Sequence, residues 1–255
     1  MRPPPTRFLS PPGFKRADKT GITLTSGIGV NADMALAAGE TSEIVEVIAD
    51  SATVQTETAM VGKTVSSTQI NNLQLNGRNP LFLALLKPGV RGGSLAGFNC
   101  GLTSGGFSIN GSRSQDNLIT FDGAAAVRTR SNGTSIGVAD LDSTQEVQIL
   151  TASYTAEYGR SAGGQIRIVT KSGTNELHGA FYEYLRNEKL DANSWTNNRN
   201  GAERNPFRYN QFGYNVSGPV FIPKFYDGRN KFFWLWSQGW IKFRQQQTVL
   251  RQAPT

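Results

Sequence analysis

Aromatic residues concentrate in the last third of this chain, where 17 of the 25 lie between Phe181 and Phe243. Along residues 211–217, Phe, Tyr and Val alternate with polar residues and glycine, and along 232–240 aromatic residues recur at even-numbered positions. Alternation with a period of two is typical of strands that have one apolar face. The chain must therefore fold so that either a protein core or lipid covers these faces.

From residue 175 onward the sequence contains about three strand signals of roughly ten residues each. Soluble sheets and outer-membrane β-barrels both have this pattern, and periodicity alone leaves the two open. A membrane barrel has to close so that no strand edge faces lipid, and single-chain barrels use at least about 8 strands. If the strands belong to such a barrel, residues 174–255 hold only the first antiparallel strands of an incomplete barrel, in a fragment that cannot form a pore alone and aggregates through its tail.

Residues 43–173 have the mixed signals of an α+β domain. Helical segments are expected at 68–73 and 80–86, where Asn79 is a candidate N-cap and Pro80 suits a first helical turn. Short strands are expected at 107–110, 118–121, 146–150 and 165–170, with a turn at Asp122–Gly123 and one helical turn at 154–158. We expect the strands at 146–150 and 165–170 to share one sheet, because their Val and Ile residues alternate in matching fashion.

The first 42 residues differ from both regions. Residues 1–12 hold several prolines and no apolar segment typical of a signal peptide, so we expect them to be unstructured. Residues 21–25 and 30–36 have strand patterns, but two strands cannot bury a core alone. We interpret residues 13–42 as the C-terminal part of a β-sandwich.

The sequence offers little for catalysis or metal binding. Cys100 is the only cysteine and His178 the only histidine, which excludes an internal disulfide and a two-histidine metal site. Residues 159–163 match the Gly-x-Ser-x-Gly pattern of hydrolase nucleophiles, but a polar turn precedes Ser161 where that motif needs a buried strand. We therefore predict that the chain is not an enzyme and binds no cofactor and no metal.

The sequence also argues against calcium and nucleic acid as ligands. Four aspartates lack the spacing of a calcium loop and are interpreted as turn carboxylates: Asp116, Asp122, Asp140 and Asp142. The net charge of +7 and the arginines among the aromatic residues suggest single-stranded nucleic acid, but the cations are scattered singly, so we predict no nucleic-acid partner. A transport component and a stand-alone β-rich secreted binding module, either an adhesin or a glycan-binding protein, remain as alternatives.

Residues 146–171 carry a specific resemblance. A strand, a helical turn that closes on Tyr158-Gly159, a Gly163-Gly164 step and a final strand ending in Thr170-Lys171 follow one another as they do at the end of the plug domain of TonB-dependent outer-membrane receptors. The Oar-like branch of that family is similar at residues 75–80 (Leu-Asn-Gly-Arg-Asn-Pro), 107–114, 121–123, 183–187 and 210–213. Residues 12–39 resemble the end of the carboxypeptidase-regulatory-like β-sandwich that precedes such plugs.

This resemblance implies a plug that blocks a β-barrel in the cell outer membrane until the protein TonB pulls an extended segment before the plug. It also implies the rest of the barrel and membrane lipid as partners, and a transported substrate that the sequence does not identify. Recognition by strand addition needs an extended segment with free backbone groups. The segment predicted to contact TonB consists of Glu43, Ile44, Val45, Glu46, Val47, Ile48 and Ala49, although Glu46 stands where the family has a small or apolar residue and an ordinary strand is the alternative.

Overall fold

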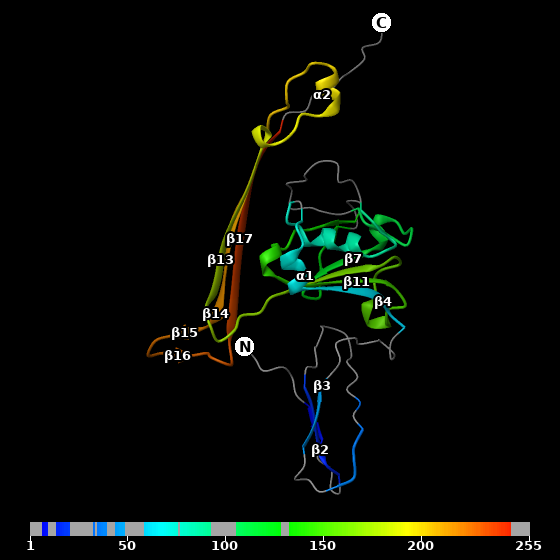
Figure 1. Cartoon of the computed structure of the whole chain (residues 1–255), viewed down its shortest axis with the longest axis vertical. Coiled ribbons are helices and arrows are strands. Elements are labelled where there is room, and N and C mark those ends of the chain that lie inside the picture. The colour runs from blue at the N-terminus through cyan, green and yellow to red at the C-terminus, as the bar shows by residue number, and fades with distance from the viewer. Residues whose placement is uncertain are drawn as a thin grey trace. The chain divides into compact units, whose positions relative to one another are not determined.

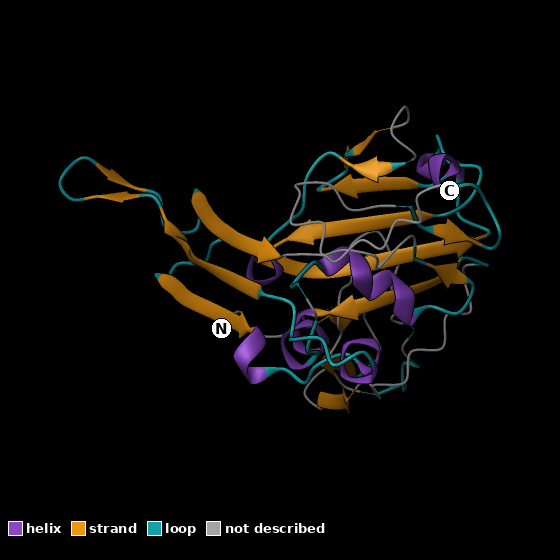
Figure 2. Ribbon diagram, turned by 90° about the horizontal axis from the view of Figure 1, so that it is seen from above, coloured by secondary structure: helices purple, strands orange, loops and turns teal. Residues whose placement is uncertain are grey.

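The computed structural model describes residues 7–9, 14–20, 33, 35–39, 44–48, 59–75, 77–92, 106–128 and 133–245. The chain divides into two compact units, Met1–Ala59 and Met60–Thr255, and each is described by itself. Figure 1 shows the whole chain and Figure 2 its secondary structure. Within the described residues no helix is both long and apolar enough to span a membrane.

The first unit contains a small three-stranded sheet in the order β1-β2-β3. Strand β1 (Arg7–Leu9) pairs antiparallel with β2 (Arg16–Thr20), and β2 pairs in parallel with β3 (Ile44–Ile48). Strand β1 lies within residues 1–12, so the expectation that this segment is unstructured is wrong for those three residues. The predicted strands at 21–25 and 30–36 fall outside the described residues, apart from residues 33, 35 and 36, which are not in a strand.

A five-stranded sheet forms the centre of the second unit, in the order β4-β11-β12-β7-β8 (Figure 1). Neighbouring strands are antiparallel except for the parallel pair β12 and β7. The bounds are β4 Val61–Ser66, β7 Leu118–Phe121, β8 Ala124–Ala125, β11 Thr144–Ala152 and β12 Gln165–Thr170. Strands β11 and β12 lie side by side, with Ile149 opposite Ile166, which confirms the predicted shared sheet.

The helices that pack against this sheet begin where the sequence predicts. Helix α1 (Ser67–Asn72) follows a capping box made by Ser66 and Gln69. The 3-10 helix η1 (Pro80–Leu86) begins at Pro80, and the Asn79 side chain accepts a hydrogen bond from the Leu81 N–H at 3.0 Å. Both helices contribute to one aliphatic core with the sheet, which includes Ile70, Leu81, Leu83, Ala84, Val147, Ile149, Ile166 and Ile168.

Short elements complete this region. The turn between β7 and β8 has left-handed backbone at Asp122 and Gly123, with φ of 47° and 85°, as the Asp-Gly pair predicts. The other elements are β5 Val90–Arg91, β6 Ser108–Ile109, β9 Val127–Arg128, β10 Thr134–Ser135, η2 Ser114–Asp116, η3 Leu141–Ser143 and η4 Ala156–Tyr158.

Three long strands follow, in the order β13-β14-β17, and all neighbours are antiparallel. Their bounds are β13 His178–Asn187, β14 Phe207–Pro219 and β17 Phe233–Gln245, which confirms the three long strands expected in the tail. A connection with the short helices η5 (Glu188–Leu190) and α2 (Trp195–Arg199) joins β13 to β14. A hairpin of β15 (Phe221–Ile222) and β16 (Tyr226–Asp227) joins β14 to β17 and projects from the end of the sheet (Figure 2).

Candidate functional site

The three-stranded sheet has two chemically different faces. Register places Tyr182, Gly213 and Gly239 on one face, together with Tyr184 and Gln211. Part of this face is covered, because Tyr209 is 4% and Gln211 7% exposed, whereas Tyr184 is 45% exposed. It also carries the side chains that contact the five-stranded domain, so we call it the inner face.

Arg78 is the centre of that contact. It follows Gly77 in the Leu-Asn-Gly-Arg-Asn-Pro segment and has a left-handed backbone with φ of 51°. Its guanidinium pairs with Asp142 at 2.7 Å and donates to the Tyr184 hydroxyl at 2.6 Å. It also lies over the rings of Tyr182 and Tyr184, at 4.9 and 4.4 Å from the ring centroids.

A second contact lies beside the first. The Ser237 hydroxyl on β17 donates to the Asp140 carboxylate at 2.8 Å, and the Tyr182 hydroxyl is hydrogen bonded to the same carboxylate. Asp140 and Asp142 flank the start of η3, so one short loop supplies both acids. The interpretation of these two aspartates as simple turn carboxylates is therefore wrong, since Asp140 contacts the long strands directly and Asp142 pairs with Arg78, which does so.

Glycines make room for Tyr182 on the inner face. A Cβ atom at Gly213 would lie 2.5 Å from the Tyr182 hydroxyl oxygen, and one at Gly239 would lie 2.8 Å from it. The tyrosine side chain therefore lies flat across β14 and β17 and reaches the Asp140 loop. Any larger residue at either glycine would displace it.

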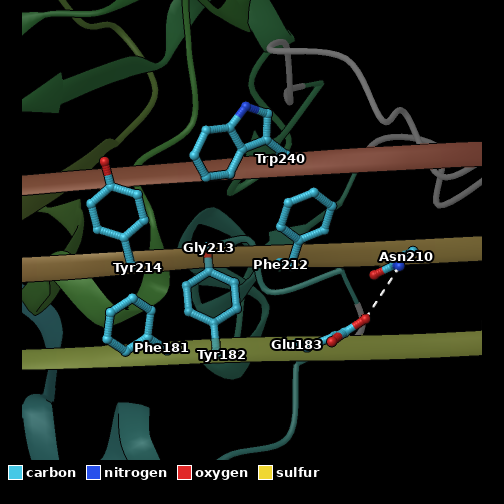
Figure 3. Close-up of a pocket in the computed structure, with 8 residues that line it drawn as sticks. All are labelled: Phe181, Tyr182, Glu183, Asn210, Phe212, Gly213, Tyr214 and Trp240. Atoms are coloured by element: carbon cyan, nitrogen blue, oxygen red, sulfur yellow. Dashed lines mark hydrogen bonds between the residues drawn. The ribbon is translucent and has the colours of Figure 1, made fainter.

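The opposite, outer face is aromatic and exposed. Phe212 stacks on Trp240 with 5.5 Å between the ring centroids, and the Tyr214 ring contacts those of Phe181 and Trp240. These rings surround a shallow hollow of about 550 Å³, in which Glu183 and Asn210 form a side-chain hydrogen bond (Figure 3). The hollow is lined by Phe181, Tyr182, Glu183, Asn210, Phe212, Gly213, Tyr214 and Trp240. A barrel fragment is expected to leave Phe232, Trp234 and Trp236 uncovered, and these side chains are 59%, 37% and 56% exposed.

A polar network fixes the Gly163-Gly164 step in the five-stranded domain. The buried Asn117 side chain donates to the Phe107 carbonyl at 2.6 Å and accepts from the Gly164 N–H at 2.9 Å. A Cβ atom at Gly164 would lie 2.7 Å from both the Ile109 side chain and the Leu150 carbonyl oxygen. This close approach explains why the Ser-Ala-Gly-Gly segment needs glycine there.

The residues weighed for catalysis are not brought together as a catalytic site. The Ser161 Oγ lies 2.9 and 2.8 Å from the backbone carbonyl oxygens of Asp116 and Gly164 and shares its one proton between them, which is a structural role. His178 begins β13 and lies 3.9 Å from Glu176, and both side chains are exposed. Among the described residues no group of three His, Cys, Asp or Glu is placed to hold a metal ion. Cys100 lies outside the described residues.

Of the predicted TonB-contacting residues, Ile44–Ile48 form β3, while Glu43 and Ala49 lie outside the described residues. Strand β3 is the last strand in its sheet, so one backbone edge is bonded to β2 and the other is bonded to no described strand. The assignment to TonB stays a prediction.

Comparison with known proteins matches both regions of the second unit. Residues 55–165 match the model of the TonB-dependent receptor plug domain, and residues 169–255 match that of an outer membrane beta barrel domain. The chain belongs to the TonB-dependent receptor family. The receptor is thus a protein of the outer membrane, the five-stranded domain is its plug, and the three long strands are part of its barrel.

Individual known proteins are similar to parts of this chain. The TonB-dependent transporter Oar of Myxococcus xanthus is 29% identical over 177 residues, which cover 66% of this chain and 16% of that protein. The outer membrane transporter YddB of Escherichia coli has a similar fold, with a TM-score of 0.50 and 16% identity over 63% of this chain and 24% of its own. The siderophore receptor PirA of Acinetobacter baumannii gives a TM-score of 0.43 and 21% identity, over 63% and 22% of the two chains. These relatives are transporters or receptors, and the chain spans less than a quarter of the length of each.

Proposed function

We propose that this chain is the gate of an outer-membrane transporter, in which the plug closes a barrel whose wall begins with β13, β14 and β17. The observation that supports it best is the asymmetry of the three-stranded sheet. Its inner face contacts the plug through Arg78, Asp140 and Ser237, whereas its outer face presents aromatic rings that suit lipid. A barrel wall between a filled lumen and a bilayer needs one face that contacts the plug and one face that contacts lipid.

The contacts suit a plug that is held in place but can be released. Arg78 pairs with Asp142, and both belong to the plug, while the described wall residues that contact Arg78 and Asp140 are uncharged, namely Tyr182, Tyr184 and Ser237. Displacing the plug from these strands would break hydrogen bonds and ring contacts without separating that ion pair. Because an unpaired buried charge costs several kcal/mol, this arrangement lowers the cost of release.

The test is the conductance of the complete receptor in a planar lipid bilayer. Deletion of residues 60–171 removes the plug and should convert a closed protein into one with stable open channels. The Gly137→Ala variant is a matched control, because nothing lies within 4 Å of a Cβ atom at that position. Equal conductance with and without the plug would contradict the gate.

We also propose that the segment Glu43–Ala49 is where TonB pairs with the receptor. Supporting this, β3 is an end strand and its sequence is β-branched, as strand addition requires. Cysteines placed one at a time along this segment should cross-link to TonB in cells, and Val45→Pro should abolish the cross-links because it removes a ladder N–H. Absence of cross-links at every position would reject the segment as the coupling site.

A further inference from the structure

The hairpin between β14 and β17 combines exposed apolar side chains with cations, and the proposed gate gives these residues no role. Residues 220–232 form a much longer connection than the usual hairpin loop of about two to five residues. The side chains of Phe221, Ile222, Tyr226 and Phe232 are 45–59% exposed, and Phe225 at the tip is 89% exposed. The same residues include three exposed cations, Lys224, Arg229 and Lys231, against one anion, Asp227, which gives a net charge of +2.

Hydrogen bonds hold the hairpin in a defined shape. Phe221 pairs with Asp227 and Ile222 with Tyr226, and the Phe225 N–H closes the tip on the Ile222 carbonyl at 3.1 Å. Buried Gly228 donates to the Val220 carbonyl at 3.0 Å, and a Cβ atom there would lie 2.6 Å from that oxygen. The Asp227 carboxylate accepts from the Arg229 N–H at 3.0 Å, so its charge is partly satisfied within the hairpin.

The hairpin is also fastened to the segment that joins the plug to the barrel. Asn175 and Asn230 exchange two hydrogen bonds, of 2.5 Å between side chains and 2.8 Å from the Asn230 N–H. The hairpin lies directly at the end of the two long strands, since only Val220 separates β14 from β15 and only the turn at residues 228–232 separates β16 from β17. The hairpin therefore lies at the end of a membrane-spanning wall, at the level where the bilayer meets water.

From these observations we propose that residues 220–232 are a membrane-surface anchor, which inserts Phe225 and its apolar neighbours between lipids and binds anionic phospholipid headgroups through Lys224, Arg229 and Lys231. Exposed aromatic residues beside basic ones are what the interface between hydrocarbon and headgroups favours. A soluble surface would leave this apolar patch in water at a cost. The inference rests on the proposed membrane wall.

The first test measures depth in the bilayer. Single cysteines at Phe225, Phe181 and Ala202 are introduced into the complete receptor with Cys100→Ser, labelled with a nitroxide, and reconstituted in phosphatidylethanolamine–phosphatidylglycerol vesicles. We expect the label at 225 to be reached by oxygen from the lipid phase, like the label on the outer face at 181. The label at 202, in the connection between β13 and β14, should be reached by a water-soluble nickel chelate.

The outcomes separate the two proposals. A label at 225 that only the nickel chelate reaches, while 181 is in lipid, overturns the anchor and leaves the barrel wall intact. Labels at both 181 and 225 in water overturn the barrel wall and the anchor together. A label at 225 that neither reagent reaches means that protein, from a second copy or a partner, covers the hairpin, and this also overturns the anchor.

The second test measures how much the cations of the hairpin contribute to lipid binding. Hydrogen exchange at the Gly228 and Phe232 amides should slow in vesicles that contain phosphatidylglycerol relative to pure phosphatidylcholine. Each cation near an anionic surface strengthens binding about fivefold. The double variant Lys224→Gln with Lys231→Gln should therefore lower the protection of these amides in phosphatidylglycerol vesicles by about 25-fold. Lys189→Gln, an exposed cation in η5, is the matched control and should change nothing; equal protection in both lipids would contradict a role for the charges.

Discussion

Replacing Arg78 with methionine removes the central contact between plug and barrel while keeping a side chain of similar length. The variant lacks the guanidinium and so loses its charge-assisted hydrogen bond of 2.6 Å to the Tyr184 hydroxyl. It also loses the contact of the guanidinium with two tyrosine rings. It also leaves Asp142, whose side chain is 27% exposed, without its ion-pair partner. With about 1.5 kcal/mol for the hydrogen bond and somewhat less for each of the other terms, discounted for partial exposure, we expect a loss of about 3 kcal/mol in plug stability.

A double-mutant cycle isolates the part of this energy that crosses from plug to wall. Tyr184→Phe removes the hydroxyl and keeps the ring, so its coupling to Arg78→Met should be about 1.5 kcal/mol, or roughly tenfold in an equilibrium constant. Tyr226→Phe is the matched control, because this tyrosine is also 45% exposed and belongs to the hairpin. Its coupling to Arg78 should be zero.

The assay is the urea concentration at which a buried cysteine becomes reactive in the folded receptor. Val147 is 0% exposed in the plug core, so Val147→Cys in a Cys100→Ser background reports plug unfolding. The midpoint shifts for the single and double variants give the coupling energy. Additive effects of Arg78→Met and Tyr184→Phe would refute the view that this hydrogen bond holds the plug to the wall.

Two other substitutions test the local structure. Gly164→Ala should destabilise the plug by about 3 kcal/mol in the same assay, because its Cβ atom meets backbone and a buried isoleucine, whereas Gly137→Ala should stay within about 0.5 kcal/mol. Hydrogen bonds from the backbone N–H groups of Glu188 itself and of Phe207 lower the pKa of the Glu188 carboxyl. Stabilisation by this carboxylate is thus fully present above its unfolded pKa of about 4.3 and is lost as pH falls through the lower folded pKa. The protection factor of the Phe207 amide, which is its exchange rate relative to that of an unfolded chain at the same pH, should therefore fall in the wild type as this carboxylate is protonated and stay constant in Glu188→Gln.

Local patterns predicted the elements of the plug because each pattern has a direct physical cause. Alternating Val and Ile residues placed β11 and β12 in one sheet, and the Asn79-Pro80 pair fixed the start of η1. The Asp122–Gly123 turn follows from the left-handed backbone that this pair tolerates. Such signals act within a few residues, so one sequence suffices to detect them.

The contact between plug and wall was beyond this kind of reasoning. Arg78 and Tyr184 are separated by 106 residues and Asp140 and Ser237 by 97, and no periodicity links positions so far apart. Asp140 and Asp142 do not have the spacing of a calcium loop, which predicts only turn carboxylates. Spacing carries no information about a partner that is distant in the sequence. The resemblance pointed to residues 75–80 as a family segment, but it did not give Arg78 its role.

The placement of charge at this contact has a consequence for how the gate can work. Had Arg78 paired with a carboxylate on the wall, each release of the plug would expose two opposite charges that the closed state had desolvated. Asp142 accompanies Arg78 in the same domain, so the released plug keeps its own ion pair and the wall keeps neutral hydroxyls that water can solvate. The force needed for release is then set by hydrogen bonds and ring contacts, which break one at a time. A wall variant with Tyr184→Glu should therefore hold the plug more tightly than the native tyrosine, and a higher urea midpoint in the cysteine-reactivity assay would show it. An unchanged or lower midpoint would mean that the plug is held mainly elsewhere.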